Sequence, residues 1–204
     1  TTPGNHERYT SSIFSLHSPY FDLEYYHNYL NPLNDYSFDY GNVNFVFLDS
    51  GFDWSRWELQ LRVWRIAPEG SGLTNNQINI LEDDLGNSSM NQIISMHHPA
   101  VNTKDDSGFF YLRDDHPSGN DECIAFNRLN FIDYCINNNV SLVLSGHTHR
   151  NHVLDIFGQE STSIDDFPLF IQTGSATTSK KSQGGRVIKV KNGSIESFDF
   201  WNFV

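Results

Sequence analysis

Two short apolar runs that lead directly into histidines constrain the fold of this chain most strongly. Gln92–Met96 runs into His97-His98-Pro99, and Ser141–Ser145 runs into Gly146-His147-Thr148-His149. Apolar runs of this length favour buried strands. Because ligand sites in α/β proteins gather at the carboxyl ends of strands, we expect both histidine clusters to belong to one site.

Helical patterns alternate with these strands. Thr74 and Gln77 form a capping-box signature, and Gly86 is a typical helix stop. A second helix is predicted over about Asp121–Asn137, and Phe167–Gln172 has the pattern of another buried strand. Two hairpins around short turns are also predicted: Tyr36–Tyr40 with Val43–Leu48, and Arg186–Lys191 with Ser194–Phe200. Mixed strands, hairpins and crossover helices predict an α/β sandwich.

The composition narrows the function. A length of 204 residues with 38% hydrophobic residues suits one domain with a real core, over residues 1–204. The formal net charge is −12 with only 13 Lys and Arg, so we expect no nucleic-acid partner, which would need a basic face. No apolar run approaches the roughly 18 residues that span a bilayer.

Cys123 and Cys135 both fall in the predicted second helix. Twelve residues of helix would separate them by about 18 Å. A disulfide needs Cα atoms within about 7 Å, so we expect two buried free thiols.

The histidine clusters have the chemistry of metal ligands, because imidazole binds Zn, Fe, Mn or Co well. In an extended chain His147 and His149 would point to one face. Of the adjacent His97 and His98, only one would then reach the site, and the other would pack or bond to the backbone. A third polar cluster, Gly4-Asn5-His6-Glu7, offers an amide that could join a ligand set already holding an ion.

Together and in this order, the three clusters resemble the calcineurin-like metallophosphoesterase superfamily, over nearly the whole chain. Tyr36–Ser50 also looks like the mid-domain hairpin of that family, and Leu73–Leu85 like the helix that follows. The resemblance implies an αββα sandwich of mixed sheets. It also implies an enzyme that hydrolyses phosphoesters, either a phosphatase or a phosphodiesterase.

The resemblance further implies a site with two metal ions, drawn from Mn, Fe, Zn or Co. Asn5, His97 and His147 would bind one ion and His149 the other. Two such ions about 3.5–4 Å apart clamp an attacking hydroxide against the phosphorus. His6 would face the phosphate, stabilising developing charge or helping the leaving oxygen depart.

The family's Asp-x-His and Gly-Asp-x-x-Asp motifs do not precede Gly4. Those motifs supply a carboxylate, an imidazole and the Asp that bridges the two ions, and without an anionic bridge two dications repel one another strongly. We therefore expect an N-terminal part of the domain to be missing and to be supplied in cis or by another chain. The isolated chain would then be inactive.

Two functions stay open. The first is a hydrolase; the acidic charge and the aromatic stretch Trp54–Trp64 favour a small or organic phosphoester, and His152 is a candidate substrate contact, although a surface histidine is the simpler interpretation. The second is a non-catalytic module of a larger extracellular or surface protein. Three N-glycosylation triplets slightly favour an extracellular or cell-surface location: Asn87-Ser88-Ser89, Asn139-Val140-Ser141 and Asn192-Gly193-Ser194.

Overall fold

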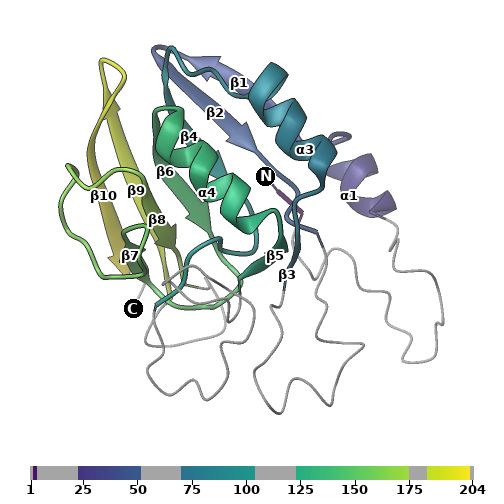
Figure 1. Ribbon diagram of the computed structural model, residues 1–204. Helices are drawn as coiled ribbons and strands as arrows, with labels where there is room; N and C mark the ends of the chain where they lie inside the picture. The colour runs from purple at the N-terminus through teal and green to yellow at the C-terminus, as the bar shows by residue number, and fades with distance from the viewer. Residues whose placement is uncertain (1, 4–22, 52–69, 104–122, 175–182, 203–204) are drawn as a thin grey trace.

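A six-stranded mixed sheet forms the centre of the protein (Figure 1). The computed structural model describes residues 2–3, 23–51, 70–103, 123–174 and 183–202. The four inner strands run parallel to one another, and the two edge strands run antiparallel to their neighbours. In sheet order the strands are β1 (Tyr36–Tyr40), β2 (Val43–Phe47), β4 (Asn91–Ser95), β6 (Val140–Ser145), β8 (Leu169–Gln172) and β7 (His152–Leu154).

Helices cover one face of this sheet (Figure 1). α3 (Asn75–Ile80) continues into a π-helical turn, η3 (Leu81–Leu85), and α4 (Arg128–Asn137) follows later in the chain. Their buried side chains join those of alternate strand residues in one apolar core. A shorter helix, α1 (Glu24–Tyr29), precedes β1. None of the helices in the described ranges is long and apolar enough to cross a membrane.

A hairpin covers the opposite face of the sheet. It consists of β9 (Gly184–Lys191) and β10 (Ser194–Asn202), and Ile195 packs with Val43, Ile93 and other strand residues in a second core. The described part of the chain thus has one helical and two β layers, as expected for an α/β fold. The second helical layer of the αββα sandwich stays a prediction.

Local sequence signals set several of these boundaries. Thr74 caps α3, because its hydroxyl accepts a hydrogen bond from the Gln77 amide while the Gln77 side chain bonds back to Thr74. Asn192 and Gly193 have φ angles of 51° and 83°, which the tight turn between β9 and β10 requires. Both hairpins and the capping box are therefore confirmed.

The helix predicted over Asp121–Asn137 begins later than expected. Ile124–Phe126 forms strand β5, which pairs in parallel with β3 (Gly70–Gly72), and Asn127 then turns the chain with φ 58°. Helical spacing alone could not reveal a strand whose partner lies about fifty residues earlier. Cys123 is consequently outside the helix.

The two cysteines are nevertheless both buried and free, as expected. Burial raises the pKa of the Cys135 thiol well above its usual range. A thiol in that state is a poor nucleophile, so Cys135 acts as a small apolar core residue.

Candidate metal centre

The four parallel strands β2, β4, β6 and β8 all end on the same side of the sheet, so the loops that follow them lie together at its carboxyl end. The segments after β2, β4, β6 and β8 remain hydrogen-bonded beyond the strand ends. The Met96 amide donates to Leu144 O at 3.0 Å, and the Gly146 amide donates to His97 O at 3.0 Å. These bonds hold the loops after β4 and β6 side by side, so residues of the two loops, about fifty positions apart in the sequence, meet at the carboxyl end of the sheet.

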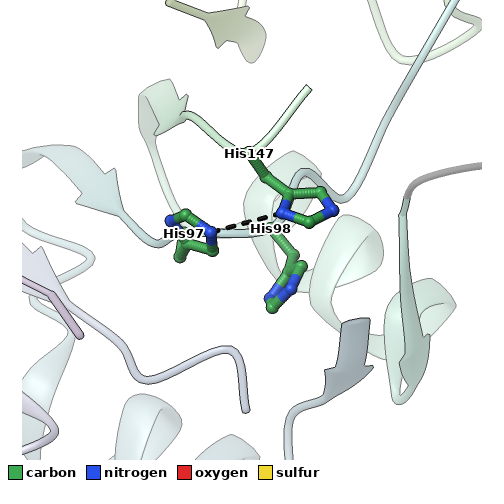
Figure 2. Close-up of side chains that lie close together, drawn as sticks. All are labelled: His97, His98 and His147. Atoms are coloured by element: carbon green, nitrogen blue, oxygen red, sulfur yellow. Dashed lines mark hydrogen bonds between the residues drawn. The ribbon is translucent and has the colours of Figure 1, made fainter. Parts of the chain in front are cut away.

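Three histidine side chains gather there. His97, His98 and His147 each present a ring nitrogen, and the three nitrogens lie within 4.8 Å of one another (Figure 2). His97 Nε2 lies 3.3 Å from His147 Nδ1. This three-histidine cluster is the only group of three or more His, Cys, Asp or Glu with such spacing within the described residues.

The loop after β4 differs from the extended chain that we expected. Its backbone bends at His97 and His98, so both rings reach the cluster instead of pointing apart. His98 is fully buried and is held by Ser50: its amide donates to Ser50 Oγ at 2.9 Å, and its Nδ1 lies 3.0 Å from the same oxygen. Ser50 therefore holds both the backbone and the ring of His98 in place.

A glycine packs directly against His98. A Cβ placed on Gly70 would lie 2.7 Å from Cγ and 2.9 Å from Cβ of His98. Neither atom is at the flexible end of the side chain, so a methyl group at position 70 would displace the ring or separate β3 from it.

Gly70→Ala should therefore destabilise the fold by about 1–3 kcal/mol, which is typical of overpacking. Gly146→Ala is the matched control, because a Cβ there meets nothing within 4 Å. Thermal unfolding of both variants checks the difference, and equal stability of the two would contradict this account.

The loop after β6 also departs from the expected extended form. The Thr148 amide donates to Gly146 O at 2.7 Å, closing a three-residue turn around His147. His147 and His149 have φ angles of 60° and 55°, in the left-handed region that residues other than glycine seldom occupy. Such strain persists only where surrounding contacts hold it, and it concentrates at functional sites.

The other predicted site residues lie outside the three-histidine cluster or outside the described residues. His149 is exposed and outside the three-histidine cluster. His152 starts the edge strand β7, and its Nδ1 contacts the Glu160 carboxylate. Asn5, His6 and the aromatic stretch Trp54–Trp64 lie outside the described residues, so their roles stay predictions.

Ser50 and Gly70 carry no direct sequence signal of a role at this site. Ser50 follows β2 as His98 follows β4, and a neighbouring strand end was the one clue available. The role of Gly70, which leaves room for the His98 side chain, is evident only from the close packing of the two residues in the structure.

Comparison with known families agrees with this geometry. A sequence model of the calcineurin-like phosphoesterases matches residues 1–151. The chain belongs to the calcineurin-like phosphoesterase family. A search of curated proteins found no match. Family membership gives the general chemistry of this calcineurin-like phosphoesterase, which is metal-dependent hydrolysis of phosphoesters.

The three-histidine cluster suits a divalent metal ion. Two nitrogens each about 2.0–2.1 Å from a tetrahedral zinc ion lie about 3.3 Å apart. The separation of 3.3 Å between His97 Nε2 and His147 Nδ1 matches that spacing. A neutral imidazole donor set also fits Mn, Fe or Co, so the geometry supports a transition metal without selecting one.

Proposed function

We propose that this protein is a phosphoesterase whose metal centre is built around His97 and His147 of the three-histidine cluster. The observation that carries the proposal is the convergence of three ring nitrogens within 4.8 Å at the carboxyl ends of adjacent parallel strands. Strand ends of this kind are the usual position for ligand sites in α/β sheets.

In this proposal the centre is binuclear. His97 and His147, with Asn5, bind one ion, and His149 binds the second. His6 faces the phosphate group and stabilises its developing negative charge. When bound, the two ions would offset the charge of the phosphoester and make hydroxide available near neutral pH.

All four proposed ligands are uncharged, and two dications a few ångströms apart repel one another strongly. We therefore propose that a bridging carboxylate from a further segment, in cis or from another chain, completes the centre. Full turnover would then need that segment, whereas binding of one ion would need only the ligands of this chain.

The preferred substrate in this proposal is a small or organic phosphoester. A formal charge of −12 gives no basic track for the backbone of a long polynucleotide. His152 is a weaker candidate for substrate contact, because the Glu160 carboxylate already engages its ring.

Metal titration combined with two hydrolysis assays tests the proposal. The chain is titrated with Zn²⁺ and Mn²⁺ by calorimetry. An aryl phosphate monoester and diester are then assayed side by side in the presence of each ion, with and without the further segment. Metal-dependent turnover supports the enzyme and distinguishes phosphatase from phosphodiesterase. Absence of both metal binding and turnover contradicts it.

The uncharged ligand set favours one alternative, a non-catalytic module that retains the fold. Such a module would bind one ion and hydrolyse neither ester, even when the assay includes the further segment. The two functions therefore differ in turnover and in binding of the second ion, whereas both bind the first ion.

A further inference from the structure

Gln172 is a fully buried polar residue at the carboxyl end of the sheet, on the same side as the three-histidine cluster. It ends β8, where it lies in register with Ser145 at the end of the neighbouring strand β6. A buried amide is costly unless its donors and acceptor are all paired, so its hydrogen bonds show what it holds.

The Gln172 amide connects three segments. Its Oε1 accepts a hydrogen bond from the Thr148 hydroxyl at 2.7 Å. Its Nε2 donates to Val101 O and to Asn102 Oδ1, each at 3.0 Å. One side chain thus links β8, the turn that carries His147, and the segment that follows His97 and His98.

The hydrogen bond to Thr148 bears directly on the metal site, because Thr148 lies between the candidate ligands His147 and His149. The backbones of His147 and His149 are both left-handed, a conformation that needs external support. The Thr148 amide closes the turn within the loop, whereas its hydroxyl ties the turn to the body of the sheet.

We propose that Gln172, acting through Thr148, is a positioning residue of the metal site. Its side-chain hydrogen bonds go to Thr148, Val101 and Asn102, so its role is to hold the turn in which the imidazole nitrogens converge. This inference rests on the proposed function. Partners behind metal ligands typically contribute tenfold to a hundredfold to metal affinity.

Three variants test this role. Thr148→Val keeps the shape of the side chain but removes the hydroxyl, Thr148→Ser restores a hydroxyl, and Gln172→Met removes the whole amide at similar volume. Gln92→Met is the matched control. Gln92 is also fully buried, and its amide bonds to Tyr134 and Asn138. It lies within β4, five positions before His97, which corresponds to about 16 Å of extended chain.

Each variant is measured in three ways: Zn²⁺ affinity by calorimetry, the visible absorption spectrum of the Co²⁺ complex, and the Tm of the metal-free protein. Thr148→Val and Gln172→Met should lower Zn²⁺ affinity about tenfold to a hundredfold and alter the Co²⁺ spectrum. Thr148→Ser should keep an affinity near that of the original chain. Gln92→Met should lower Tm as Gln172→Met does, with unchanged affinity and spectrum.

The possible failures are distinguishable. If the original chain binds neither ion, the proposed function fails, and the positioning role fails with it. If the original chain binds metal and Thr148→Val and Gln172→Met bind it equally well, only the positioning role is overturned. Equal loss of affinity in Gln92→Met would mean that global destabilisation explains the effect.

Discussion

Replacing His147 with alanine is expected to abolish tight metal binding. The variant removes a ring nitrogen that lies 3.3 Å from His97 Nε2, and so removes one of the two donors with the spacing of a shared ion. The loss in Zn²⁺ affinity should exceed the roughly hundredfold that a supporting residue contributes. Metal-dependent turnover, where the original protein shows it, should disappear with the ion.

Calorimetric titration with Zn²⁺ measures this effect. His27→Ala is the matched control, because His27 lies in α1, is outside the three-histidine cluster and bonds to Asn34 Oδ1. The control should bind Zn²⁺ as the original protein does. Retained affinity in His147→Ala would show that the cluster is not the metal site.

Phe131→Ala should cause the largest loss of stability among the substitutions considered, about 3–5 kcal/mol. Phe131 lies in α4, has no exposed surface and is among the largest fully buried side chains of the described residues. Its removal leaves a cavity in the core between the helices and the sheet, beneath the strands that carry the histidines.

Chemical denaturation measures this loss. Leu129→Ala is the control in the same helix, since Leu129 is 40% exposed and alanine has the higher helix propensity. The control should change stability by less than about 1 kcal/mol. Similar losses in the two variants would mean that α4 is not anchored through Phe131.

Much of the fold was predictable because its signals are local. Alternating apolar residues and an Asn-Gly turn define the β9–β10 hairpin within twenty residues, and the Thr74–Gln77 pair defines the start of α3. The strand β5 was missed because it is short and is stabilised by pairing with β3, far away in the sequence.

The same distinction applies to the site. The sequence located both histidine clusters, because each follows an apolar run typical of a buried strand, and the family resemblance then implied His97 and His147 as ligands. It could not decide the orientation of His98, since that depends on a bend in the backbone, on the Ser50 hydroxyl and on the space left by Gly70.

The sequence by itself determined which residues end the central strands and therefore which side chains meet at the carboxyl end of the sheet. Only the tertiary structure decided how those side chains converge. Gln172 and Thr148 lie 24 residues apart and carry no recognisable pattern, yet their hydrogen bond holds the histidine turn. Periodicity reports on burial within one element, whereas the geometry of a site depends on contacts between elements that no local pattern records.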